Sequence, residues 1–206
     1  ILDVGCAQGT LALLLAERGH RVWALDIRQD FLDYAVSRHE RGEAHFVCGN
    51  VLEVELEDRF DLIFCNQTIE HLVHPEKLIR RLHQWLVQAG RLVVTTPNGL
   101  YLKNSLPSFS KLGDVSQYED RQYFADGDGH FFAYHENELL EIFRNSGFRR
   151  VFVKYFETPW ISGHMKIRYL HSILPATMLQ MMDGMTLNLP GLSKRLTHQL
   201  LVVGHR

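Results

Sequence analysis

The sequence predicts an α/β fold: a doubly wound, mostly parallel sheet of seven strands with helices on both faces. Two observations predict it. Short apolar segments typical of buried strands alternate with amphipathic segments typical of helices, and a glycine-bounded turn joins the first strand to the first helix. Right-handed crossovers between parallel strands then place helices on both faces. The expected strands are 1–4, 21–26, 44–48, 61–65, 91–95, 149–156 and 199–204.

Composition limits the classes of protein. A chain of 206 residues with 46% hydrophobic content is sufficient for one domain, 1–206, with a substantial core. The formal net charge of −2 gives no overall field to attract nucleic acid. No apolar run approaches the roughly 18 residues that span a bilayer. Each cysteine falls at or near the end of a predicted strand, so we expect buried, reduced thiols and a cytoplasmic protein. They are Cys6, Cys48 and Cys65.

The first nine residues, Ile-Leu-Asp-Val-Gly-Cys-Ala-Gln-Gly, read as a buried strand running into a turn, with a helix from Thr10. Unpaired N–H groups at such a turn point towards a ligand, and Gly5 and Gly9 allow its close approach. Binders of dinucleotides use G-x-G-x-x-G around a pyrophosphate. Here the pattern is D-x-G-x-A-x-G, and the carboxylate of Asp3 favours a cationic or zwitterionic ligand instead.

This turn resembles the first motif, D-x-G-x-G-x-G, of the class I S-adenosylmethionine-dependent methyltransferases, with Ala7 at the middle glycine. The chain is similar to the small-molecule enzymes of the ubiquinone and menaquinone pathway type. The resemblance implies a Rossmann-like sheet whose last strand is antiparallel, S-adenosyl-L-methionine as cofactor, and a helix before Ile1, so that an N-terminal segment is expected to be missing. It places six turn residues at the cofactor, namely Asp3, Gly5, Cys6, Ala7, Gln8 and Gly9.

Asp26 is the last residue of the second predicted strand. Its distance along the chain from the glycine turn is near the roughly 20 residues at which an acid contacts the ribose hydroxyls in nucleotide-binding folds. We expect Asp26 and the adjacent Ile27 at the cofactor. The alternative is an acid that favours a helix N-terminus, a role for which Asp30 is better placed.

The third strand leads into Gly49-Asn50-Val51-Leu52. By resemblance, Asn50 bonds the adenine amino group while Val51 and Leu52 lie on the ring. An Asn in an ordinary turn is the alternative.

The fourth strand leads into Asn66-Gln67-Thr68-Ile69-Glu70-His71, which is similar to the fourth motif of small-molecule methyltransferases. That resemblance places Asn66 and Gln67 at the cofactor and the strand end at the methyl-transfer site. Asn66-Gln67-Thr68 also matches the N-glycosylation pattern, which a buried strand end makes a chance match.

Glu70, His71 and His74 suggest a metal site, but Pro75 biases His74 away from helical angles, so the two imidazoles should not share a face. Some quinone-pathway catechol methyltransferases that resemble this chain carry a Glu where Gln67 stands, and metal binding there would depend on it. We therefore expect no metal, a structural Glu70, and His71 as a wall of the site.

Residues 99–130 show no clear period and read as a long excursion, the kind of segment that often carries function. The run from 129 to 148 is similar to the segment before the sixth strand in these methyltransferases, where a His lies over the acceptor. His130 is the expected general base, with His71 second. A structural His is the alternative.

An insertion, 158–197, precedes the last strand and carries a net charge of +3, from four Lys and Arg residues and one Asp. Its methionines and basic residues suggest a lid, a membrane surface contact or cover for a lipid-like acceptor. The alternatives are a helical pair packed on the sheet edge or a homodimer contact.

The predicted function is methyl transfer to a small-molecule, sugar or lipid-linked acceptor, with oxygen as the methylated atom. No Asn-Pro-Pro-Tyr follows the fourth strand, and no basic patch with interleaved aromatics favours nucleic acid. Two other classes remain: a catalytically silent cofactor-binding domain, and a nicotinamide-dependent oxidoreductase, which lacks its glycine spacing here.

Overall fold

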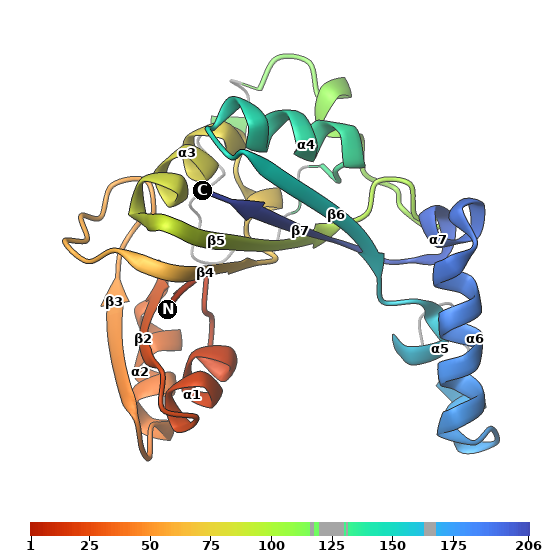
Figure 1. The fold of residues 1–206 in the computed structure, drawn as a ribbon, viewed down its shortest axis with the longest axis horizontal. Helices are drawn as coiled ribbons and strands as arrows, with labels where there is room; N and C mark the ends of the chain where they lie inside the picture. Colours follow the sequence, from red (N-terminus) through yellow and green to blue (C-terminus); the bar gives the residue numbers. More distant parts are fainter. Residues whose placement is uncertain (116–117, 120–129, 131, 163–167) are drawn as a thin grey trace.

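The computed structural model describes residues 1–115, 118–119, 130, 132–162 and 168–206. Its centre is a seven-stranded sheet in the order β3-β2-β1-β4-β5-β7-β6 (Figure 1). The first five strands pair in parallel, and β7 runs antiparallel between β5 and β6. The strands are β1 (Leu2–Val4), β2 (Arg21–Asp26), β3 (Glu43–Cys48), β4 (Phe60–Asn66), β5 (Leu86–Pro97), β6 (Arg150–Phe156) and β7 (Gln199–His205). The predicted fold class is confirmed.

Helices alternate with the strands as expected. The α-helices are α1 (Thr10–Glu17), α2 (Gln29–Arg38), α3 (Pro75–Trp85), α4 (Glu136–Asn145), α5 (Pro159–Ser162), α6 (Ala176–Asn188) and α7 (Pro190–Leu196). Short 3₁₀ helices are η1 (Ile69–His71), η2 (Phe109–Lys111) and η5 (Arg168–Ser172). Helices α1 and α2 pack against β2 and β3, whereas α3 and α4 pack against each other and against β5, β6 and β7.

The alternation of side chains along β2 builds two cores, one on each face of the sheet. Val22 and Ala24 join a small cluster beneath α1 and α2. Trp23 and Leu25 point the other way, into a larger cluster that includes the apolar faces of α3 and α4. Because successive side chains of a strand point to opposite faces, a continuously apolar strand such as β2 must be covered on both.

The amphipathic run from Pro75 and the glycine at position 90 predict a helix that ends at Gly90, but helix α3 ends at Trp85. Leu86 adopts an extended backbone, is fully buried and pairs with Phe60, so β5 begins directly after the helix. Gly90 lies inside this strand, where a Cβ would stand 3.0 Å from the Phe60 carbonyl oxygen. The glycine thus permits close strand approach instead of ending a helix.

The expectation of three buried cysteines is correct for Cys6 and Cys65 and wrong for Cys48, which is exposed. Cys48 ends β3, the outermost strand at one edge of the sheet, where only one neighbour covers the chain. All three thiols are free.

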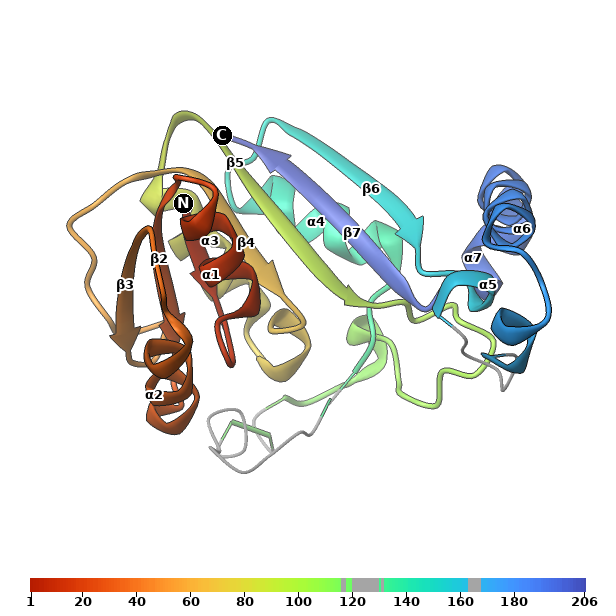
Figure 2. The same cartoon turned by 90° about the horizontal axis from the view of Figure 1, so that it is seen from below.

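The predicted insertion forms an arm, defined as α5, η5, α6 and α7, beyond the carboxyl end of β6 (Figures 1 and 2). In the described part of the arm, α7 lies against β6, and α6 packs on α5 and α7. The Thr158 hydroxyl donates to Asp183 at 2.6 Å, and the Trp160 indole N–H donates to Thr186 at 2.8 Å. None of the helices in the described ranges is long and apolar enough to cross a membrane.

Candidate active site

The opening turn bends through three left-handed residues, Gly5 (φ 67°), Ala7 (φ 46°) and Gly9 (φ 74°). A Cβ on Gly5 would stand 2.2 Å from the Thr68 hydroxyl oxygen, and one on Gly9 would stand 2.7 Å from the Cβ of Ala35. Both glycines are therefore required by close packing as well as by backbone angle. Ala7 keeps the left-handed angle despite its Cβ, a costly conformation that often marks a functional turn.

Asp26 holds this turn in place. Its carboxylate accepts hydrogen bonds from the backbone N–H of Ala7 at 2.8 Å and of Arg28 at 2.9 Å. The N–H groups of Gly5 and Cys6 bond the Leu25 carbonyl oxygen, so the end of β2 and the turn form one unit. The predicted neighbours, the turn and Asp26, are brought together. Ile27, the next expected contact, is 42% exposed beside them.

Asp3 lies on β1 beside this unit with only 3% of its surface exposed. Burial raises the pKa of its carboxyl to about 7, and the nearby charge of Asp26 acts in the same direction. Within the described ranges no Lys or Arg forms an ion pair with Asp3. A buried acid without a basic partner fits a ligand that brings its own positive charge.

Asn50 follows the neighbouring strand end, and the Gly49 N–H bonds the Asp26 carbonyl oxygen at 2.9 Å. The Asn50 side-chain oxygen accepts from the Leu52 N–H at 3.0 Å, and its amide donates to Glu53 at 2.9 Å. This is the local turn that the alternative interpretation described. Val51 and Leu52 lie at the edge of the larger core.

The end of β4 presents Asn66 and Gln67 next to β5 and β7. Asn66 accepts a hydrogen bond from the Thr95 hydroxyl at 3.1 Å. Gln67 has a left-handed backbone (φ 50°), and its side-chain amide lies 3.0 Å from that of Gln199 on β7. The carboxyl end of the sheet is therefore polar on three adjacent strands, and one residue there is strained.

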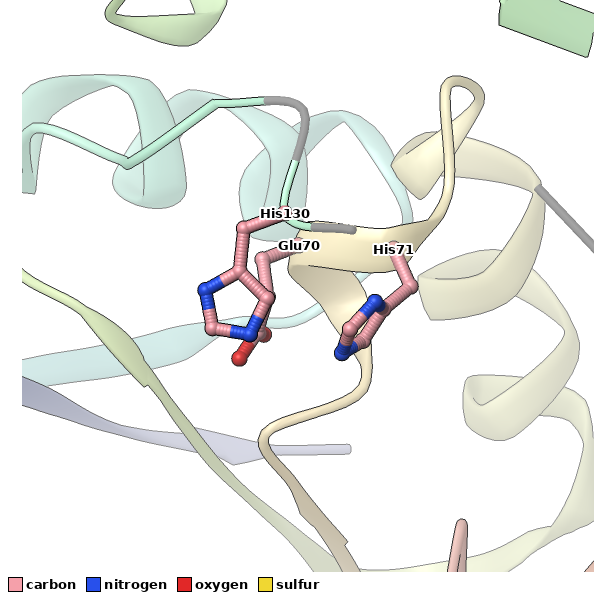
Figure 3. Close-up of side chains that lie close together, drawn as sticks. All are labelled: Glu70, His71 and His130. Carbon is pink, nitrogen blue, oxygen red and sulfur yellow. The ribbon is translucent and has the colours of Figure 1, made fainter. Parts of the chain in front are cut away.

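Glu70, His71 and His130 form a cluster next to this end of the sheet (Figure 3). One donor atom from each lies within 4.8 Å of the others. The two imidazole rings meet edge to face, with centroids 4.7 Å apart. Glu70 is fully buried, His71 half-buried and His130 exposed.

Glu70 accepts a hydrogen bond from the buried Thr96 hydroxyl at 3.0 Å, and burial raises the pKa of its carboxyl to about 7. The Tyr134 hydroxyl donates to the Ile69 carbonyl oxygen at 3.2 Å, which ties η1 to the chain that follows His130. His74 lies outside the cluster, paired with Glu119 at 2.7 Å. The predicted separation of His71 from His74 therefore holds.

Sequence reasoning missed several supports of the site, namely Thr68, Thr96, Tyr134 and Gln199. Thr96 carried a usable signal, because it is a polar residue at the end of an apolar strand that neighbours the fourth strand. Tyr134 and Gln199 carried no such signal in the sequence. Tyr134 contacts a residue 65 positions away, and Gln199 contacts one 132 positions away.

Residues 2–94 match the family described as "Methyltransferase domain". The chain is 34% identical over 98 residues to a malonyl-[acyl-carrier protein] O-methyltransferase of Acetivibrio thermocellus, covering 47% of this chain and 35% of that protein. It is 30% identical over 102 residues to a ubiquinone biosynthesis O-methyltransferase of Coxiella burnetii, covering 48% of this chain and 43% of that protein. These matches span less than half the length of the relatives.

The fold also matches solved structures across the whole chain. Phosphoethanolamine N-methyltransferase 2 of Haemonchus contortus, solved with S-adenosyl-L-methionine, aligns with a TM-score of 0.67 at 19% identity, covering 100% of this chain and 48% of that one. Such identity shows the fold alone. The structural match therefore shows a Rossmann-like methyltransferase fold, and residues 2–94 of that fold are similar to the methyltransferase-domain family. The turn with Asp3 and Asp26 has the chemistry that a positively charged ligand such as S-adenosyl-L-methionine needs.

Proposed function

We propose that this protein transfers a methyl group from S-adenosyl-L-methionine to an oxygen atom of a small-molecule, sugar or lipid-linked acceptor. The observation that carries the proposal is the left-handed turn locked by Asp26, with the buried Asp3 carboxylate beside it. A nicotinamide cofactor would place its diphosphate beside that carboxylate, which disfavours an oxidoreductase.

The cofactor supplies a methyl group already activated on a sulfonium, so the chain's task is to hold the reacting groups in line. In this proposal Asp3 faces the positively charged amino-acid end, and Asp26 and Ile27 contact the ribose. Val51 and Leu52 pack on the adenine, and Asn50 contacts its edge. The turn backbone and the ends of the other strands, at Asn66 and Gln67, complete the cradle.

His130 is the proposed general base, with His71 as the second candidate. An acceptor hydroxyl must lose its proton, and a His takes up a proton readily near neutral pH. His130 is exposed at the cluster while His71 lies half-buried against it, so an acceptor arriving from solvent meets His130 first. Replacing His130 by Ala is expected to lower turnover while leaving cofactor affinity unchanged.

The class of acceptor is proposed from two lines of support. The two curated relatives are both named O-methyltransferases, one acting on a carrier-bound malonyl group and one in ubiquinone biosynthesis. The chain also lacks the Asn-Pro-Pro-Tyr and basic features that the sequence would need for nucleic acid. Mass spectrometry of hydroxylated and carboxylated candidates, with labelled methyl cofactor, tests the acceptor. Methylation confined to amines contradicts oxygen transfer.

Cofactor binding is tested by calorimetric titration with S-adenosyl-L-methionine and S-adenosylhomocysteine. Asp26→Ala should weaken binding about 10- to 150-fold, the scale of a lost hydrogen bond to a charged group. Asp30→Ala is the matched control, since Asp30 is an exposed acid that pairs with Arg28 at the start of α2. Equal losses in both variants, or none in Asp26→Ala, would overturn the role of Asp26.

We also propose that the arm contacts a partner surface and that the protein works in the cytoplasm. Of the fifteen large apolar side chains exposed in the described ranges, eight lie on the helices of the arm or on the turns that join them. They are Ile161, Tyr169, Ile173, Met178, Met181, Met185, Leu189 and Leu192. Exposed apolar groups at this density mark contact surfaces. Co-sedimentation with anionic vesicles supports a membrane contact or lipid-linked acceptor, and a concentration-dependent sedimentation coefficient supports a homodimer.

A further inference from the structure

We propose that Glu70, His71 and His130 bind a divalent transition-metal ion such as Zn²⁺. The sequence argued against a metal here because Gln67 is uncharged and His74 cannot join His71. The structure supplies a third donor from elsewhere: His130 is 59 positions along the chain from His71 and meets it edge to face. Figure 3 shows the two rings and the Glu70 side chain gathered at one point.

The spacing of the donors suits a single ion. One nitrogen from each imidazole and one Glu70 oxygen lie within 4.8 Å of one another. Donors around a tetrahedral zinc are about 3.3 Å apart, as Zn–N and Zn–O bonds of about 2.0–2.1 Å require. The donors therefore already lie within about 1.5 Å of the spacing that a tetrahedral ion requires.

The donor types select the class of ion. Two imidazoles with one carboxylate form a set used for zinc with an open fourth position, and imidazole also suits iron, copper and nickel. Mg²⁺ and Ca²⁺ prefer oxygen ligands and fit this set poorly. Zn²⁺ is therefore the probe of choice.

The surroundings of Glu70 suit a metal-binding carboxylate whose position is held by a hydrogen bond from the protein. Its carboxylate is fully buried and accepts from the Thr96 hydroxyl, which fixes one oxygen, and the other oxygen lies 3.2 Å from the Gln67 side-chain amide. No Lys or Arg of the described ranges forms an ion pair with it. A buried carboxylate is costly unless a cation or hydrogen bonds compensate it, and a metal ion provides that charge.

The role of the ion rests on the proposed function, whereas its binding does not. An acceptor hydroxyl oxygen at the open fourth position would lose its proton more readily, because a bound cation stabilises the oxyanion. That proton passes to solvent water. With the ion bound, His130 serves as a ligand, so the general-base role proposed above for His130 applies to the protein without the ion.

The test is titration of the metal-free protein with Zn²⁺ alone, followed by metal analysis after gel filtration. We expect one ion per chain in the unchanged protein and affinity about 100-fold weaker in His71→Ala and His130→Ala. Thr96→Val should weaken binding about 10-fold through its effect on Glu70. His74→Ala is the matched control, a neighbouring His outside the cluster, and should bind as the unchanged protein does.

Co²⁺ in place of Zn²⁺ gives a second readout, since its visible absorption reports coordination by nitrogen. The spectrum should change in His130→Ala, an exposed position where folding is preserved. Absence of stoichiometric binding, full binding in His130→Ala, or equal loss in His74→Ala would overturn the site. Titration with S-adenosyl-L-methionine on the same samples separates the two proposals, because its failure leaves the metal result unaffected.

Discussion

At the scale of single residues, the site depends on contacts that join segments far apart in the chain. Gly5 is the sharpest example: it adopts a left-handed angle and lies under the Thr68 side chain, 63 positions later. Two separate costs therefore oppose any side chain at position 5. One comes from the backbone angle and the other from the clash.

Gly5→Ala should destabilise the fold by about 2–4 kcal/mol, from about 1 kcal/mol of left-handed strain and an overpacking cost of about 1–3 kcal/mol. Adding Thr68→Ala removes the atoms that stand 2.2 and 3.2 Å from the new Cβ. The double variant should recover the stability lost to overpacking and still lose the stability that the left-handed backbone angle costs. Urea unfolding of the four proteins in this cycle measures both, and strictly additive losses would show that no clash exists.

The pKa of Asp3 gives stability a dependence on pH. Burial raises this pKa from 3.8 to about 7 in the folded chain. The folded state thus holds a proton that the unfolded state releases, and Asp3 lowers stability as the pH rises from about 4 to about 7. Asp3→Asn cannot ionise, so without cofactor it should match the unchanged protein near pH 4 and exceed it at pH 8 by up to about 4 kcal/mol.

Urea unfolding of both proteins at the two pH values measures that difference. The same variant should bind S-adenosyl-L-methionine more weakly at pH 8, because the acid that faces its positive charge is gone. A stability gap that is independent of pH would contradict the raised pKa.

At the scale of elements, the sequence predicted most strands and helices because apolar alternation and glycine turns are local signals. The sequence misplaced the end of α3 because a glycine such as Gly90 can have either of two structural roles. After an amphipathic run glycine usually ends a helix, but here it allows β5 to approach Phe60. Which role it has depends on the pairing of Leu86 with Phe60, a contact between separate segments.

Contacts between segments far apart in the chain also decide which parts of the site could be predicted. Asp3, the turn and Asp26 were brought together correctly, because parallel strands align their carboxyl ends at one edge. The joining of Glu70 with both His71 and His130 was not foreseen, since it depends on how the chain after residue 98 returns over η1. That return is fixed by Tyr134, whose ring is fully buried.

Tyr134→Phe should therefore cost about 1 kcal/mol in stability, since the Ile69 carbonyl loses a buried donor. We also expect lower methyl-transfer turnover, because η1 carries Glu70 and His71. Tyr155→Phe is a suitable control: its hydroxyl donates to Glu136, away from the cluster. Thermal unfolding and steady-state kinetics distinguish the two variants, and equal kinetics in both would remove Tyr134 from the positioning of the site.

At the scale of the whole molecule, the chain combines a sheet covered by helices with an arm that contacts the sheet domain through α7, where Lys194 pairs with Glu136. Helix α6 buries Leu179 and Thr186, and Thr186 accepts a hydrogen bond from Trp160 of α5, while Met178, Met181 and Met185 remain exposed. The sheet can fold around its own two cores, whereas the arm is secured by its attachment at α5 and α7. The two parts should therefore respond separately to a change at their junction.

Thr158→Val tests that separation. It removes the hydroxyl that donates to Asp183 at 2.6 Å and leaves this carboxylate without that donor, a loss of about 1.5–3 kcal/mol to the docking of α6 on α5. Limited proteolysis should then cleave the arm faster, while the thermal transition of the sheet and the affinity for S-adenosyl-L-methionine stay unchanged. Ser172→Ala, an exposed change on the same arm, should leave proteolysis as it was. A joint loss of arm protection, sheet stability and cofactor affinity in Thr158→Val would show instead that arm and sheet form one cooperative unit.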